Sequence, residues 1–141
     1  MKKRKITVLS SFCLFVIGIS LMFLLPSTVL AKSEGKVVNV KLTTALKLLK
    51  QKKRKITYVL YASRYCIHCQ KMKKIYRQAI AKHPNKEIFK VDLANEPNSS
   101  YKKLKGLHVN AIPTLIKYNG THEVTRLVGE SKISVVDKFL Q

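Results

Sequence analysis

The chain has 141 residues, of which 46% are hydrophobic and 25% are charged, so it is long enough for one domain with an ordinary hydrophobic core. Its 28 Lys and Arg residues outnumber seven Asp and Glu residues, and the formal net charge is +21. The basic residues are dispersed, and neither stacking aromatics nor a binding motif accompanies them. This pattern argues against a nucleic-acid partner and favours a solvated basic surface that attracts anionic lipid headgroups or wall polymers.

The N-terminus has the three parts of a signal peptide. Residues 2–5 are basic, residues 6–25 are almost wholly apolar, and residues 26–31 end in small or modest side chains before a cleavage site after Ala31. The apolar run is also just long enough to span a bilayer. We therefore expect residues 1–31 to be a cleaved signal peptide or a retained N-terminal membrane anchor. Either places the rest of the chain outside the cytoplasm, secreted or tethered to the outer face of the membrane.

The first predicted elements follow a short polar linker, residues 32–36, which precedes a single domain, residues 37–141. Residues 37–40 are typical of a strand. Leu42, Ala45, Leu46 and Leu49 then recur at helical spacing, with Thr43 or Thr44 as the expected N-cap. The next strand, residues 56–61, lacks polar alternation beyond one Thr, as in a central strand that is covered on both faces.

Cys66 and Cys69 form a C-x-x-C pair directly after this strand. The pair opens a predicted helix that ends before Pro84, since the residue preceding a proline resists helical geometry. The apolar face of this helix consists of Met72, Ile75, Tyr76, Ala79 and Ile80. A helix N-terminus favours the thiolate of the first cysteine. In an oxidising compartment the pair is either a redox centre or a structural disulfide, and so short a loop stabilises little, which favours the redox interpretation.

The remaining elements complete an α/β pattern. Residues 88–91 are strand-like, and residues 99–105 form a short predicted helix with Gly106 as its C-cap. Residues 114–118 and 124–128 are predicted strands of a hairpin around Asn119-Gly120. A last helix is expected after Ser131 as cap, with an apolar face of Ile133, Val136, Phe139 and Leu140. The predicted order is β-α-β-α-β-α-β-β-α, a central mixed sheet flanked by helices.

The chain resembles the thioredoxin superfamily over residues 37–141. The resemblance rests on C66-I-H-C69 opening a helix, on K90-V-D-L-A-N-E-P97, and on V109-N-A-I-P-T-L115, followed by N119-G120 and V128-G129. It implies a thioredoxin-like fold in which Cys66 is the nucleophile and Cys69 is the resolving cysteine. It also implies that Pro113 is cis and lies beside the cysteines. Ile112, Pro113 and Gly129 are then the expected substrate-binding residues, with the Ile112 backbone bonding an extended substrate strand.

Three departures from the thioredoxin pattern concern the site. Tyr65 stands where thioredoxins usually have Trp, Ile67-His68 replaces Gly-Pro, and Leu60 occupies the position of a buried acid. His68, with Ile67 and Tyr65, is the group expected to tune the acidity of the cysteine pair. A histidine before the second cysteine resembles the dipeptides of disulfide oxidases and isomerases, where a stabilised thiolate makes the disulfide a stronger oxidant. The other histidines, His83, His108 and His122, are expected on the surface.

These features predict an extracytoplasmic thiol–disulfide oxidoreductase that acts on exported proteins or peptides, with the oxidase or isomerase direction favoured. No cofactor fingerprint is present, so electrons would pass to or from an unidentified redox partner protein. The leader and the C-x-H-C also resemble small exported proteins of Gram-positive bacteria, including bacteriocin-transport accessory proteins. The alternatives are a disulfide reductase, a copper-binding module that uses Cys66, His68 and Cys69, and a redox-inactive wall-associated module.

Overall fold

The computed structural model describes residues 34–51 and 56–141 of the chain. The predicted leader, residues 1–31, lies outside the described residues, so its assignment as a signal peptide or membrane anchor stays a prediction. Among the residues that the structure describes, no helix is both long enough and apolar enough to cross a membrane.

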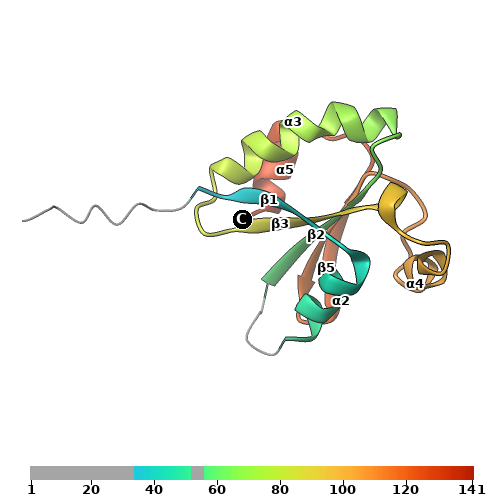
Figure 1. The fold of residues 1–141 in the computed structure, drawn as a ribbon. Coiled ribbons are helices and arrows are strands. Elements are labelled where there is room, and N and C mark those ends of the chain that lie inside the picture. The colour runs from blue at the N-terminus through green and yellow to red at the C-terminus, as the bar shows by residue number, and fades with distance from the viewer. Residues whose placement is uncertain (1–33, 52–55) are drawn as a thin grey trace, which may run out of the picture. The chain divides into compact units, whose positions relative to one another are not determined.

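The described residues form a five-stranded mixed sheet with helices on both faces (Figure 1). The elements are β1 (Lys36–Val40), α2 (Leu42–Lys50), β2 (Ile56–Ala62), α3 (Ile67–Ala81), β3 (Glu87–Asp92), the 3₁₀ turn η2 (Leu93–Asn95), α4 (Ser100–Gly106), β4 (Thr114–Asn119), β5 (His122–Val128) and α5 (Ile133–Phe139). The strand order is β1-β3-β2-β4-β5, in which β1, β3 and β2 are parallel and β4 is antiparallel to β2 and β5. The predicted element order and mixed sheet are confirmed.

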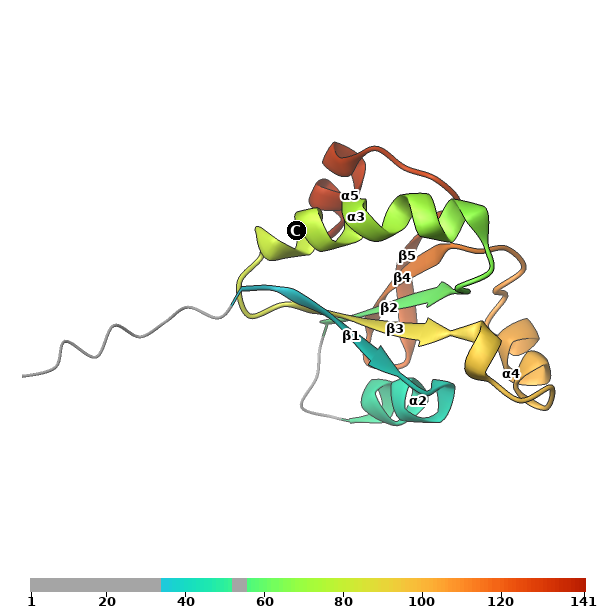
Figure 2. The same cartoon turned by 45° about the horizontal axis from the view of Figure 1, so that its top comes forward.

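Strand β2 lies at the centre of the sheet and is buried on both faces. Tyr58 and Leu60 pack into the core that α3 and α5 cover, whereas Val59 and Tyr61 pack into the core that α2 and α4 cover. Figure 2 shows α3 and α5 on one side of the strands and α2 on the other. Because side chains alternate along a strand, only a nearly continuous apolar run can serve both cores.

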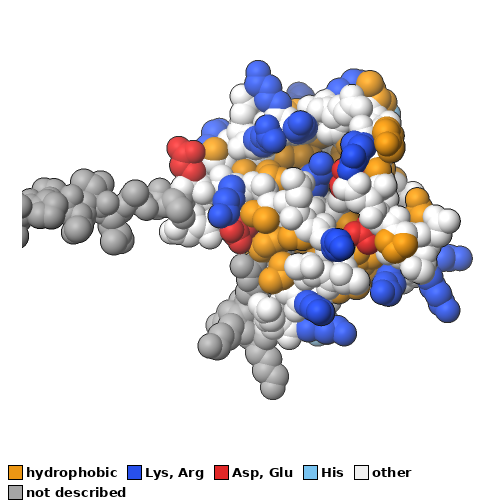
Figure 3. Space-filling view, viewed as in Figure 1, with side chains coloured by type: hydrophobic (Ala, Val, Ile, Leu, Met, Phe, Trp, Pro, Cys, Tyr) orange, Lys and Arg blue, Asp and Glu red, His pale blue; other side chains and the backbone are white. Residues whose placement is uncertain are grey.

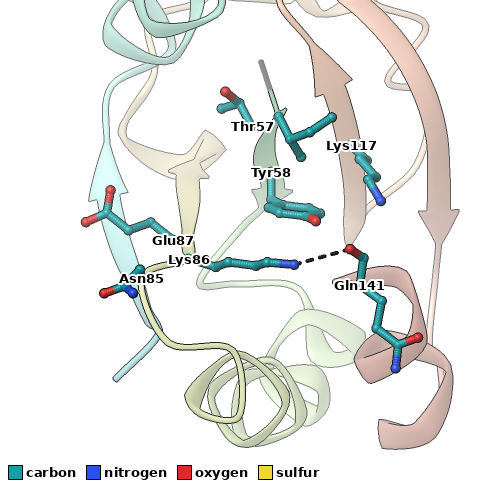
Figure 4. Close-up of a pocket in the computed structure, with 8 residues that line it drawn as sticks. Thr57, Tyr58, Asn85, Lys86, Glu87, Lys117 and Gln141 are labelled. Carbon is teal, nitrogen blue, oxygen red and sulfur yellow. Dashed lines mark hydrogen bonds between the residues drawn. The ribbon is translucent and has the colours of Figure 1, made fainter. Parts of the chain in front are cut away.

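The residues after α5 are tied to the start of β2 and to the residue before β3. Tyr58 Oη donates to the carbonyl oxygen of Leu140 at 3.0 Å, and Lys86 Nζ donates to the carbonyl oxygen of Gln141 at 3.3 Å (Figure 4). A pocket of about 350 Å³ lies here, and Lys86 and Lys117 approach the Tyr58 ring. The cysteine pair follows the opposite end of β2, so this pocket is separate from the predicted thiol site.

Basic side chains are spread over the surface. On the face shown in Figure 3, Lys and Arg side chains occur on several elements, and few acidic side chains lie among them. This distribution fits the interpretation of a solvated basic surface better than that of one compact basic patch.

Helix α2 begins earlier than the sequence predicts. Its N-cap is Lys41, so neither Thr43 nor Thr44 caps it, and the prediction of a threonine cap is wrong. The backbone N–H of Leu42 donates instead to Glu96 Oε1 at 2.8 Å. A carboxylate 54 residues away supplies the cap, and local sequence cannot show this.

The caps at two further helix ends lie one residue away from their predicted positions. The N-cap of α5 is Lys132, and the backbone N–H of Ser131 donates to Met72 Sδ at 3.3 Å, which ties this loop to α3. Gly106 is the last residue of α4 and is not its C-cap. The left-handed backbone lies at His108, with φ of 52°. The expected capping roles of Ser131 and Gly106 are therefore wrong.

His83 does not lie on the open surface as expected. Only 14% of its side chain is exposed, and its Nε2 lies 2.8 Å from Asp137 Oδ1. This pair joins the residues after α3 to α5. His83 does follow a helix, as predicted, but the packing of α5 against α3 covers its ring.

The folded domain begins before the predicted boundary. Gly35 is buried, and Lys36 already pairs with Glu87 in the sheet, so the predicted linker, residues 32–36, loses these two residues to the domain. A Cβ at Gly35 would lie 2.0 Å from the carbonyl oxygen of Ile80 and 2.5 Å from that of His83. Only glycine fits this close approach between two backbone segments.

We expect Gly35→Ala to lower the free energy of unfolding by about 1–3 kcal/mol, because the added methyl group overlaps backbone atoms. The matched control is Gly106→Ala, since a Cβ there meets nothing within 4 Å in a helical segment. This control should raise the free energy of unfolding by about 0.5–1 kcal/mol. Urea unfolding of both variants is the measurement, and equal effects at the two glycines would contradict the packing argument.

Candidate active site

Cys66 is placed by the short loop that joins β2 to α3, and it is the N-cap residue of α3. Its Sγ accepts a hydrogen bond from the backbone N–H of Cys69 at 3.2 Å. The same thiol lies 3.7 Å from the carbonyl oxygen of Ile112, to which it donates. The half-buried first cysteine therefore lies between the start of the helix and the Ile112 segment, as the resemblance implied.

Cys69 differs from Cys66 in its surroundings. Its residue is only 8% exposed, and it belongs to the core that includes Leu60 and Tyr76. Burial raises the pKa of the Cys69 thiol to about 11, and a hydrogen bond with Cys66 acts in the same direction. Both cysteines are free thiols in this structure. The more accessible Cys66 is the better candidate for the nucleophile, and the protonated, buried Cys69 suits the resolving role.

The Ile112–Pro113 peptide bond is cis, as the resemblance implied. The backbone N–H of Gly129 donates to the carbonyl oxygen of Pro113 at 2.8 Å. Gly129 has φ of +80°, a left-handed conformation that glycine adopts without strain. Ile112 thus lies next to Cys66 and is followed by the cis Pro113, and Gly129 uses its N–H to hold Pro113.

His68 points to an acidic partner that the sequence analysis missed. Its Nδ1 lies 2.6 Å from Glu130 Oε1, and Lys71 Nζ lies 3.2 Å from the same oxygen. Hydrogen bonds from His68 and Lys71 hold the pKa of Glu130 below its usual range. The available signal was the position of Glu130 directly after Gly129, on a loop that the resemblance already placed beside the cysteines.

The active-site loop is fastened through Arg64 to the end of β3 and to the turn η2. Its Nε lies 3.2 Å from Asp92 Oδ2, and its guanidinium also bonds the side chain of Asn95. The side-chain amide of Gln70 donates to the carbonyl oxygen of Arg64 at 2.8 Å. These contacts position the residues before Cys66, and the sequence analysis assigned none of them to the site.

A groove of about 610 Å³ is lined by Tyr65, the residue before Cys66, and by Ile112, whose carbonyl oxygen contacts Cys66. Its apolar walls include Tyr65, Leu93, Tyr101 and Ile112, and Lys105 lies on its rim. Tyr65 is 82% exposed, and Ile67 is also exposed. The groove adds an α4 surface that the sequence analysis missed. The exposed aromatic at position 101 was its only sequence signal.

The copper alternative requires Cys66, His68 and Cys69 to face one ion. The His68 ring instead lies against Glu130. Within residues 34–51 and 56–141, no three His, Cys, Asp or Glu side chains are grouped so that they could hold a metal ion.

Comparisons with known proteins agree with this geometry. A family model described as thioredoxin matches residues 31–141. Thioredoxin f from spinach chloroplast has a TM-score of 0.62 and 18% identity, over 76% of this chain and 95% of that chain. A thioredoxin from Schistosoma mansoni has a TM-score of 0.61 and 22% identity, over 74% of this chain and 93% of that chain. No curated protein matches the chain significantly. These findings give no support to the narrower resemblance to bacteriocin-transport accessory proteins.

We expect Cys69→Ser to accumulate mixed disulfides on Cys66, because the buried thiol that would release the substrate is gone. Cys66→Ser should accumulate none, since Cys69 is too buried to attack a protein substrate. The measurement is nonreducing electrophoresis after acid quenching, with the double serine variant as control. Equal trapping by the two single variants would contradict the assigned roles.

Proposed function

Because the chain belongs to the thioredoxin family of thiol–disulfide oxidoreductases, we propose that it forms or exchanges disulfides in exported proteins or peptides, outside the cytoplasm. Cys66 and Cys69 are the redox pair. In the favoured direction the pair starts as a disulfide and the substrate as a dithiol. The enzyme ends as a dithiol, and an unidentified redox partner protein must oxidise it again.

The positive charge around the cysteine pair is the observation that supports the proposed oxidase direction of disulfide exchange. Leu60 stands where an acid would lie, and the pocket next to Cys69 is lined by Lys73, Arg77 and Lys90 with no acid among its described residues. Positive charge stabilises a thiolate, and stabilising the reduced form makes the disulfide a stronger oxidant. His68 follows Cys66 by two residues, and we propose that its ring, held by Glu130, acts in the same direction.

The groove between Tyr65 and Tyr101 supports a peptide substrate. An extended chain beside Ile112 would place a cysteine at Cys66 Sγ and an apolar side chain against the two tyrosines. A substrate thiolate attacks Cys66, and Cys69 leaves with the electron pair of the broken disulfide. A second substrate thiolate then attacks the substrate sulfur of the mixed disulfide and releases Cys66, so two electrons move from substrate to enzyme.

The extracytoplasmic location rests on the sequence of residues 1–31, which has the basic, apolar and small-residue parts of an export signal. The proposal includes both fates of this segment, cleavage after Ala31 or retention as a membrane anchor. Either fate would deliver the redox pair to a compartment in which disulfides persist.

We expect the reduction potential of the Cys66–Cys69 pair to lie above about −200 mV, well above the value of about −270 mV for thioredoxin. His68→Gln should lower this potential by about 10–30 mV, because it removes a group that stabilises the thiolate. Equilibration with glutathione buffers is the measurement. A potential near that of thioredoxin would favour the reductase alternative.

Location is tested by labelling intact cells with a membrane-impermeant maleimide after mild reduction. We expect Cys66 of the exported protein to be labelled without lysis, because its thiol is accessible beside the groove. The Cys66→Ser variant is the control for labelling at other thiols. Labelling that requires lysis would contradict an extracytoplasmic enzyme.

A further inference from the structure

A second pocket adjoins the buried cysteine. Its volume is about 520 Å³, and it lies between α3 and the strands β1, β3 and β2. The parallel register pairs Lys90 of β3 with Asn39 of β1 on one side and with Leu60 of β2 on the other. The three residues therefore lie side by side across the sheet. Residues abreast in a sheet point to the same face. Leu60 packs in one core with Cys69, so Lys90 also projects beneath α3.

Cys69 must carry negative charge at one point of every exchange. It is a thiolate either when it attacks the mixed disulfide or when it leaves Cys66. Its burial disfavours that charge, and Leu60 offers neither a proton acceptor nor a countercharge. Some other group on the sheet must therefore stabilise the buried Cys69 thiolate.

The groups that face Cys69 leave one candidate. Cys66 raises the pKa of the Cys69 thiol, and Tyr76 is itself buried with a raised pKa, so its hydroxyl stays protonated. Arg64 lines the same pocket, but it is paired with Asp92. A backbone hydrogen bond at Ser63 and the charge of Lys90 are what lower the pKa of Cys69. Lys90 is therefore the side chain whose charge opposes the effect of burial.

The two other basic residues of the pocket differ from Lys90 in placement. Lys73 and Arg77 are exposed residues of α3, whereas Lys90 is partly covered on the central part of the sheet. A charge is screened less when solvent is partly excluded from it. Lys90 is thus better placed than either α3 residue to act on a buried thiol.

We propose that Lys90 is a positioning residue that holds the Cys69 thiolate in place of a buried acid, and that water in the adjoining pocket exchanges the Cys69 proton with solvent. The volume of the pocket is ample for several water molecules, and its lining is polar enough to hold them. This inference rests on the proposed role of Cys66 and Cys69 as an exchanging pair, but it does not depend on the direction of exchange.

The step balances in both directions. When a substrate thiolate attacks Cys66, the Cys66–Cys69 bond breaks, and Cys69 leaves as a thiolate beside the Lys90 ammonium. The thiolate then takes a proton from pocket water. In the reverse step Cys69 gives its proton to that water and attacks Cys66 Sγ. The substrate leaves as a thiolate, and the Cys66–Cys69 disulfide is restored.

The test compares Lys90→Met with Lys90→Arg, which keeps the positive charge. Lys117→Met is the matched control, because Lys117 is also a partly covered strand lysine but lines the pocket at the start of β2. All three changes are made in the full chain that carries Cys13→Ser and Cys66→Ser, so that Cys69 is the remaining cysteine, and its thiolate is titrated by its ultraviolet absorbance. This titration needs no substrate, so it tests Lys90 separately from the proposed function.

We expect Lys90→Met to raise the pKa of Cys69 by about 0.5–1 unit, which corresponds to a three- to tenfold loss of thiolate at a given pH below it. In the chain with both cysteines, stopped-flow measurement with a peptide disulfide should show the resolving step slowed by about the same factor. The first attack by Cys66 should be unchanged. Lys90→Arg and Lys117→Met should match the unmodified protein in both measurements.

An unchanged titration in Lys90→Met would overturn the proposal. Equal shifts in Lys90→Met and Lys90→Arg would also overturn it, because packing rather than charge would then be responsible. An equal shift in Lys117→Met would assign the effect to net charge. If Lys90→Met fails to fold by circular dichroism, Lys90→Gln replaces it under the same criteria.

Discussion

The hydrogen bond from the Cys69 N–H to Cys66 Sγ is the interaction on which the site depends. It makes the first cysteine the cap of α3, so the start of the helix and the position of the nucleophile are set together. The bond also keeps the two cysteines one helical turn apart, within reach of each other. β2 delivers the chain to this point, because its burial between two cores leaves it little freedom to shift.

The different roles of the two thiols, nucleophile for Cys66 and resolving thiol for Cys69, follow from their burial, since the residue type is the same. Cys66 is half-buried and lies against the Ile112 carbonyl, whereas Cys69 turns into the core under α3. A protein substrate can therefore reach one sulfur only. Burial makes the Cys69 thiol difficult to ionise. Lys90, on the strand next to β2, supplies a positive charge that opposes this effect.

The predicted elements were correct wherever the apolar pattern alone decides, as in the doubly covered β2 and the apolar face of α3. The predicted caps failed where a distant residue does the capping. Glu96 accepts a hydrogen bond from the first residue of α2, and Met72 accepts one from the backbone just before α5. The nearby Thr and Ser side chains therefore do not cap these two helices. Burial of His83 against Asp137 was missed for the same reason, since α5 had first to be placed on α3.

The amino-acid sequence by itself determined the class of fold and the redox pair, because strand and helix periodicity and the C-x-x-C spacing are local properties, and the resemblance to thioredoxins indicated the segment around Pro113. Tertiary structure alone decided which groups surround that pair. Glu130 lies in the loop after β5, Tyr101 in α4 and Lys90 in β3, so they meet the site only after the sheet has formed. Electrostatic effects fall off with distance in space and not with separation along the chain, so the sequence signals at Glu130 and Tyr101 did not by themselves place these residues at the site.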